Sequence, residues 1–360
     1  MEKEKNNCIR TVFICWRPYQ IFNAINMVIN NVEGIKGNSD IFISDLPAVL
    51  KYKDELVKTN IFSHVGVFNE EGKKGRWKCF LDMAFPYISM QFDALQKYPH
   101  WRKYDIIVAS GFHSFFIRMA NINKKAKVIF MEDGMASYLN IDIDKFHSSK
   151  FHRILKILFN TGIHVINIQK IYVYFPELIS QKYHIQIGRL PQISVLAFKI
   201  VKQVFGNTSY SDSEYRKIIY LTQPMENIWY IRDDYSEHCV QNLLLLYSEN
   251  VIVRIHPRHL EFTTSLNVDK NMQFWELDAA RLKSDNILIS IFSTASFTPF
   301  FLLDKSPIII LLYKIAAKEN SSFYKNADLF VKNISKFYPS SIFTPGNMDE
   351  FAEILKNLLE

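Results

Sequence analysis

The sequence is poor in cysteine, and its cysteines form no pattern that would define a metal site or a crosslinked fold. The 360 residues include only Cys8, Cys15, Cys79 and Cys239. None of them has CxxC or Cys/His spacing, so neither a zinc site nor a disulfide framework is predicted. Such a chain suits a reducing compartment, and we expect it in a cytoplasm.

Export and membrane-spanning segments are not predicted either. The first residues, MEKEK, lack the apolar stretch of a signal peptide. Residues 286–303 carry no charge and are long enough to be tested as a membrane span. Hydroxyl residues and Pro299 interrupt this run, so we interpret it as a strand, a loop and a helix. No internal repeat is visible.

Apolar residues and positive charge are what the sequence has in quantity. Hydrophobic residues make up 48% and aromatic residues 14% of the chain, which is enough to bury the cores of two ordinary domains. The net charge of +7 favours an anionic partner, such as a nucleotide, an acidic sugar or a phospholipid surface. Nucleic acid is disfavoured because no recognised reader motif accompanies the charge.

Apolar strand-like runs alternate with helical patterns, which is typical of parallel sheets with crossover helices. We expect a Rossmann-like N-terminal domain over residues 1–205 and a second one over residues 206–360, with the boundary near the polar stretch at 206–213. The fold class is therefore α/β and GT-B-like, with two doubly wound domains facing a central cleft. Glycosyltransferases, epimerases and phosphorylases share it. The predicted strands are at residues 11–15, 39–43, 63–68, 105–109, 127–130, 170–174, 218–221, 251–255, 272–275, 287–291 and 307–312.

Two motifs place ionisable side chains directly after predicted strands, at the edge where open α/β sheets bind ligands. Asp133 lies in Glu132-Asp133-Gly134, where the glycine would allow a sharp turn or close approach of a ligand. His256 lies in His256-Pro257, where the proline forces the chain to turn. Asp133 is a candidate general base, although the same motif also suits an ordinary helix cap, and His256 also suits a structural role.

Further polar residues follow the other predicted strands of the C-terminal half. Ser293 and Thr294 could begin a helix whose amides bind phosphate, or could simply cap that helix. Glu276, after the strand predicted at 272–275, could accept hydrogen bonds from ribose hydroxyls. Thr222 and Gln223 end one more strand. Arg254 and Arg258 would add positive charge beside His256 if they are not solvated surface residues.

The order of these motifs, together with Arg17-Pro18-Tyr19-Gln20 after the first strand, resembles bacterial lipooligosaccharide sialyltransferases of glycosyltransferase family 52. Related motifs occur in other bacterial sialyl- and polysialyltransferases. The resemblance spans roughly residues 10–345. Family members commonly have a Thr- or Ser-Pro-Leu-Gln string where this chain has Arg-Pro-Tyr-Gln.

The resemblance implies an inverting, metal-independent transferase that uses CMP-sialic acid, needs no cofactor, and acts on a terminal sugar, such as galactose, of a surface glycan. By position, Asp133 would deprotonate the acceptor hydroxyl, and His256 would stabilise or protonate the departing phosphate. Gln20 and His113 are the expected acceptor-binding residues. The expected donor-binding residues are Gly134, Thr222, Gln223, Pro257, Glu276, Ser293 and Thr294.

Other interpretations stay open. Asp142-Ile143-Asp144 is a DxD string that could chelate a divalent cation. The basic, amphipathic stretch at residues 145–170 could rest on the inner membrane, or could pack as an ordinary helix. Another donor such as activated glucose, a sugar-nucleotide epimerase or hydrolase, and a non-catalytic glycan- or membrane-binding module are alternative functions. The sequence leaves a homodimer open.

Overall fold

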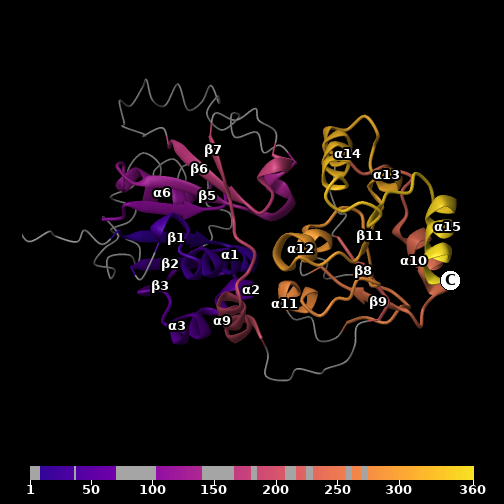
Figure 1. Ribbon diagram of the computed structural model, residues 1–360, viewed down its shortest axis with the longest axis horizontal. Helices are drawn as coiled ribbons and strands as arrows, with labels where there is room; N and C mark the ends of the chain where they lie inside the picture. Colours follow the sequence, from indigo (N-terminus) through magenta and orange to yellow (C-terminus); the bar gives the residue numbers. More distant parts are fainter. Residues whose placement is uncertain are drawn as a thin grey trace, which may run out of the picture. The chain divides into compact units, whose positions relative to one another are not determined.

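The computed structural model describes residues 9–35, 38–69, 103–139, 166–179, 185–206, 216–223, 230–256, 262–269 and 274–360. The chain divides into two units, which are described separately (Figure 1). The N-terminal unit comprises Met1–Ser137 and Ile141–Val204, and the C-terminal unit comprises Tyr138–Asn140 and Phe205–Glu360.

The N-terminal unit contains a seven-stranded sheet in the order β3-β2-β1-β4-β5-β6-β7. All of its strand pairs are parallel. The central strands are buried on both faces, as their apolar sequences require. The strands are β1 (Thr11–Cys15), β2 (Ser39–Ser44), β3 (His64–Phe68), β4 (Ile106–Ala109), β5 (Lys127–Met131), β6 (Ile168–Val173) and β7 (Gln186–Arg189).

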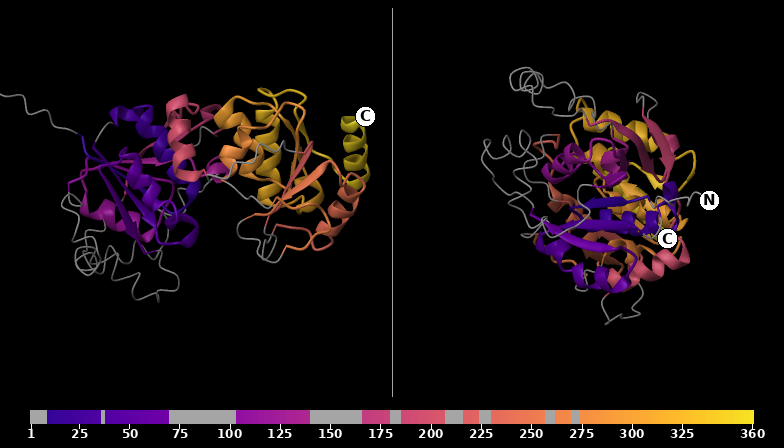
Figure 2. Two further views of the ribbon diagram at one scale, coloured as in Figure 1. Left: turned by 90° about the horizontal axis from the view of Figure 1, so that it is seen from below. Right: turned by 90° about the vertical axis from the view of Figure 1, so that its left-hand side faces the viewer.

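Helices cover both faces of this sheet, and α1 and α6 lie on opposite sides of the strands (Figure 2). Right-handed crossovers explain this arrangement, because β1 connects to β2 in one direction and β4 connects to β5 in the other. The helices are α1 (Pro18–Ile29), α2 (Pro47–Leu50), α3 (Lys53–Thr59), α6 (Ser114–Ile122) and α9 (Val195–Phe205), with 3-10 turns at Val32–Gly34, Gly134–Ser137 and Pro176–Leu178.

The C-terminal unit contains a parallel five-stranded sheet in the order β12-β11-β10-β8-β9. Helices α10 and α12 lie on opposite sides of it (Figure 1). Its strands are β8 (Ile218–Leu221), β9 (Val251–Arg254), β10 (Ile287–Ser290), β11 (Ile308–Leu311) and β12 (Ile342–Phe343). Its helices are α10 (Glu237–Leu245), α11 (Trp275–Ala279), α12 (Thr294–Leu303), α13 (Tyr313–Ala316), α14 (Ser322–Ile334) and α15 (Met348–Leu359).

Each sheet has a switch point, where the connections from two neighbouring strands run in opposite directions. The switch point lies between β1 and β4 in the N-terminal unit, and between β8 and β10 in the C-terminal unit. Because every strand in a sheet is parallel, the loops that follow these strands gather at one edge. That edge is where ligands bind in open α/β sheets.

An aromatic cluster supports the loop after β10. Phe292 packs edge-on against Phe330, with ring centroids 5.9 Å apart, and Phe297 does the same at 5.1 Å. All three side chains are buried. The cluster fixes the base of the loop that leads into α12, and it accounts for part of the high aromatic content.

The α/β fold class with two Rossmann-like domains is confirmed. The interpretation of residues 286–303 as strand, loop and helix is also confirmed by β10 and α12. We expected a strand at residues 272–275. The structure describes only the last two of these residues, and the prediction is wrong there, because Trp275 begins α11. Strands β7 and β12 were not predicted. Within the described part of the chain, no helix is both long and apolar enough to cross a membrane.

Candidate active site

Asp133 follows β5 at the ligand-binding edge of the N-terminal sheet and is half-buried. Gly134 comes next with φ +68°, a left-handed conformation that favours glycine. The side-chain amide of Gln20 donates from Nε2 to Asp133 Oδ1 at 2.9 Å, while its Oε1 accepts from the Trp16 amide at 2.7 Å. Gln20 is fully buried. It therefore holds the Asp133 carboxylate in a fixed orientation.

Burial and two neighbouring groups set the acidity of Asp133. Burial raises the pKa of this carboxyl, while the hydrogen bond from Gln20 and the positive charge of Arg17 oppose the increase. Arg17 is exposed and lies two residues after the end of β1. Burial and the charge of Asp133 raise the pKa of the neighbouring Cys15 thiol. The Cys15 thiol therefore holds its proton more firmly than an ordinary cysteine does.

Glu132, the other acid of the motif, has a structural role. It is fully buried, and its carboxylate accepts from the Tyr19 hydroxyl at 2.8 Å and from the Tyr174 amide at 2.9 Å. Its backbone carbonyl accepts from Asn23 Nδ2 at 3.0 Å. These contacts join α1 to the ends of β5 and β6. They leave Asp133 as the acid that can reach a ligand.

His113 and Trp16 lie at the switch point of the same sheet, after β4 and β1. His113 is the N-cap of α6, and its Nδ1 accepts from the Phe115 amide at 3.2 Å. Its ring stacks on Trp16, with centroids 5.4 Å apart and an interplanar angle of 22°. Both side chains are half-buried. The stack holds the two rings together at this edge of the sheet.

Three loops of the C-terminal sheet are tied together at its switch point. Gln223, after β8, forms two hydrogen bonds with the backbone of Phe292, after β10: its Nε2 donates to the carbonyl at 2.9 Å, and its Oε1 accepts from the amide at 2.7 Å. The His256 amide, after β9, donates to Thr222 Oγ1 at 2.9 Å. The structure thus brings Thr222, Gln223 and His256 together as the sequence predicts for one sheet edge.

Ser293 caps α12, as the alternative interpretation of its motif proposes. Its hydroxyl accepts from the Ala295 amide at 3.3 Å, and Thr294 is the first helical residue. Behind them, the hydroxyls of Ser290 and Ser296 are hydrogen bonded at 2.8 Å. The first turn of α12 stands directly after β10, so its positive dipole end lies at the ligand-binding edge.

Glu276 lies in the first turn of α11 and not at the end of a strand. Acidic residues are favourable there because the helix N-terminus is positive, and Glu276 and Asp278 both occupy it. Glu276 is buried, and burial raises its pKa to about 7, with Arg254 opposing the increase. A carboxyl of this kind changes its charge near neutral pH.

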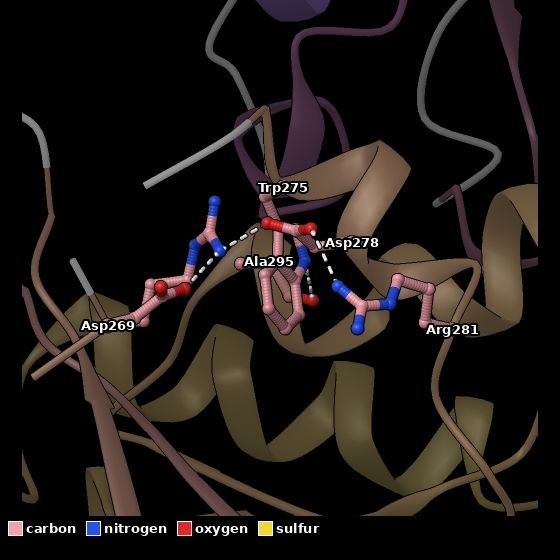
Figure 3. Close-up of polar contacts among 6 residues, drawn as sticks. Asp269, Trp275, Asp278, Arg281 and Ala295 are labelled. Carbon is pink, nitrogen blue, oxygen red and sulfur yellow. Dashed lines mark hydrogen bonds and ion pairs between the residues drawn. The ribbon is translucent and has the colours of Figure 1, made fainter. Parts of the chain in front are cut away.

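Arg254, at the end of β9, forms a buried ion-pair network with Asp269 and Asp278, the two aspartates labelled in Figure 3. Its Nη1 lies 2.9 Å from Asp269 Oδ2 and 2.5 Å from Asp278 Oδ2. Its guanidinium also lies over the Trp275 ring, 5.1 Å from the centroid. The expectation that Arg254 adds free positive charge for a phosphate is therefore wrong, because two carboxylates neutralise it.

Several sequence predictions fall outside the described residues. They are Pro257, Arg258, the DxD string at 142–144 and the basic stretch up to residue 165. The positioning role of Gln20 was missed by the sequence interpretation. A signal for it exists, since Gln20, Asn23 and Asn26 form a buried row of amide side chains, spaced by three, on the otherwise apolar α1. Buried amides need partners. Gln20 finds the Asp133 carboxylate, whereas Asn23 and Asn26 pair with backbone carbonyls and the Tyr174 hydroxyl.

Comparison with solved structures shows the same architecture. A UDP-N-acetylglucosamine 2-epimerase matches with a TM-score of 0.51 and 10% identity over 98% of this chain and 87% of that chain. The glycotransferase of kitacinnamycin matches with a TM-score of 0.52 and 10% identity over 98% and 91%. Spinosyn rhamnosyltransferase SpnG, complexed with thymidine diphosphate, matches with a TM-score of 0.50 and 9% identity over 98% and 92%. At these identities the likeness shows the fold alone.

The fold and the sequence family together define a glycosyltransferase of the sialyltransferase type. The family model of alpha-2,8-polysialyltransferases (POLYST) matches residues 11–278, which is more than half of the chain. The chain belongs to this family. No curated protein sequence matches it. The predicted sialyltransferase class is thus confirmed at this level, and the narrower resemblance to the lipooligosaccharide family stays a prediction.

Proposed function

We propose that this protein is an inverting sialyltransferase that moves sialic acid from CMP-sialic acid to the terminal sugar of a bacterial surface glycan. The observation that carries the proposal is the family match, which spans residues 11–278 and so includes both Asp133 and His256. The likeness of the fold to nucleotide-sugar enzymes supports it.

Asp133 is the proposed general base. As the acceptor hydroxyl attacks the anomeric carbon, its proton passes to the carboxylate, and the glycosidic bond forms on the face opposite the leaving group. Burial raises the pKa of Asp133, which strengthens it as a base. The hydrogen bond from Gln20 keeps the carboxylate aimed at one place.

The C-terminal unit is proposed to receive the leaving group. When the bond between the anomeric carbon and the phosphate oxygen breaks, the electron pair stays on CMP. His256 can donate a proton or hydrogen bond to that oxygen, and the N-terminal turn of α12 with Ser293 and Thr294 can bind the phosphate charge. These groups supply the stabilisation without a metal ion. Glu276 is the proposed partner of the ribose hydroxyls.

The acceptor has two candidates. Galactose is the sugar that the resemblance implies. An anionic sugar such as sialic acid is favoured by a specific observation, because the exposed Arg17 lies close enough to Asp133 to lower its pKa. The carboxylate of such an acceptor would lie near the positive charge of Arg17, beside Asp133. The family's name for an alpha-2,8-polysialyltransferase activity points the same way.

A donor panel tests the proposal. Purified protein is incubated with CMP-sialic acid or a UDP-sugar, with glycans that end in galactose or in sialic acid, and the released nucleotide is measured. We expect acceptor-dependent release of CMP. Asp133→Asn should reduce it by roughly 10²–10⁴-fold because the base is lost. Asp105→Asn is the control and should retain activity, because this exposed residue precedes β4 and so lies at the opposite edge of the same sheet.

Other outcomes would identify the alternatives. Release of UDP would indicate another donor, and donor turnover without acceptor would indicate an epimerase or hydrolase. Binding without nucleotide release would indicate a non-catalytic module. Wild-type turnover by Asp133→Asn would show that the base is a different group.

A further inference from the structure

Helix α12 has a gap in its hydrogen bonding one turn after its start. Pro299 lies inside the helix. In a regular α-helix the N–H of residue 299 would donate to the carbonyl of Ala295, but proline has no N–H. The proline ring also crowds the carbonyl four residues earlier. The Ala295 carbonyl, in the first turn, therefore needs a donor from elsewhere.

Trp275 supplies that donor. The indole Nε1 of this α11 residue donates to the Ala295 carbonyl oxygen at 2.7 Å (Figure 3). Trp275 is buried, so water is a poor replacement for it. The bond joins α11 to the first turn of α12, the turn that Ser293 caps and that begins with Thr294.

Arg254 in turn holds Trp275 in place. The guanidinium lies over the indole ring, and its ion pair with Asp278 fixes the other end of α11. Arg254 is the last residue of β9, two positions before His256. A continuous set of contacts thus runs from the end of β9, two positions before His256, to the first turn of α12, which Ser293 caps.

We propose that Trp275 is a positioning residue for the donor phosphate: its indole N–H takes the place of the missing amide of Pro299 and fixes the first turn of α12. This inference rests on the proposed function in one respect, namely that the first turn of α12 binds the phosphate of CMP. Trp275 itself does not touch the donor. Pro299 provides no amide donor for the Ala295 carbonyl, and the Trp275 indole N–H donates to it instead.

A double-mutant cycle tests the inference in the full-length protein. Trp275→Phe removes the N–H and keeps a ring beneath Arg254. Pro299→Ala restores a backbone N–H to the helix. Two quantities are measured in both single variants and the double variant: hydrogen exchange of the backbone amides at the start of α12, and affinity for CMP by calorimetry.

We expect Trp275→Phe to speed exchange in the first turn of α12 and to weaken CMP binding, each by about fivefold, the size of one net hydrogen bond. In the Pro299→Ala background the same substitution should change either quantity by less than about twofold, because the amide of residue 299 now serves the Ala295 carbonyl. This rescue is what a mere packing role of Trp275 would not produce.

The opposite results overturn the inference. Equal losses in both backgrounds would mean that Trp275 acts through packing, and unchanged exchange in Trp275→Phe would mean that its bond does not hold the turn. If the exchange data show the rescue while wild-type protein fails to bind CMP, the proposed function is wrong at its donor site. In that case the positioning of α12 stands without a phosphate role.

Discussion

Asp133 shows how two opposing effects can tune one side chain. Burial raises its pKa, and Arg17 and Gln20 lower it. A general base works only when deprotonated, so activity is lost as pH falls through the pKa of Asp133. Without the positive charge of Arg17, less opposes the effect of burial, so the pKa of Asp133 rises.

We therefore predict that Arg17→Ala moves the acidic limb of the pH profile of kcat/KM to higher pH, while Arg17→Lys leaves it near the wild-type position. Because Arg17 is exposed, salt should reduce the difference between the two variants. The profiles are measured at low and high ionic strength. If the acidic limb does not move in Arg17→Ala, the charge of Arg17 does not influence the pKa of the general base.

The sequence was enough to pick out candidate site residues at the ends of strands. It was not enough to predict which side chains those residues contact. Asp133 and His256 were found because each follows an apolar run. The Gln20 amide that orients Asp133 lies on α1, far away in the chain. Nothing local to Asp133 specifies it, and only the parallel pairing order that places β5 near β1 brings α1 to this edge.

At the scale of elements, the buried carboxylate of Glu132 joins α1 to two strand ends. Its two oxygens accept from the Tyr19 hydroxyl and the Tyr174 amide. The Tyr174 hydroxyl in turn donates to Asn23 Oδ1 at 2.8 Å. Loss of the carboxylate would leave buried donors without an acceptor, and such groups are expensive in a dry interior.

We predict that Glu132→Ala lowers the free energy of unfolding by roughly 2–4 kcal/mol, the penalty for two buried donors left unsatisfied. Glu132→Gln should be much milder, since its carbonyl oxygen can still accept from Tyr174 and the Tyr19 hydroxyl can rotate to accept from the amide. Chemical denaturation measures both. Similar losses in the two variants would contradict this role of the oxygen atoms.

The sequence predicted long apolar strands better than short or mixed segments. Trp275, the first residue of α11, was taken for the end of a strand because a few apolar residues fit either period. The ion pair between Asp278 of α11 and Arg254 of β9 is a contact that the local sequence does not show. Strands β7 and β12 are short edge strands, exposed or half-buried. β7 has one large apolar residue, Ile187, and β12 is only two residues long, so neither forms a run that marks a strand. Pairing with a neighbouring strand defines them.

At the scale of the whole molecule, the candidate residues divide between two units that fold around separate sheets. Asp133, Gln20 and His113 belong to the N-terminal unit, and Thr222 and His256 belong to the C-terminal unit. If the first set serves the acceptor and the second the donor, binding of CMP and chemistry should be separable by mutation.

A ligand that binds only the native state stabilises it by an amount set by its concentration relative to Kd, about 2.7 kcal/mol at 100 times Kd. We predict that saturating CMP raises the Tm of Asp133→Asn as much as that of the wild-type protein, although the variant is inactive. His256→Ala should show a smaller increase at the same CMP concentration, because one partner of the phosphate is gone. Thermal unfolding with and without CMP measures both, with UMP as the control for base specificity. A reduced CMP effect in Asp133→Asn would place Asp133 at the donor, and an unchanged effect in His256→Ala would remove His256 from the phosphate. Either result would require the roles of the two units to be assigned again.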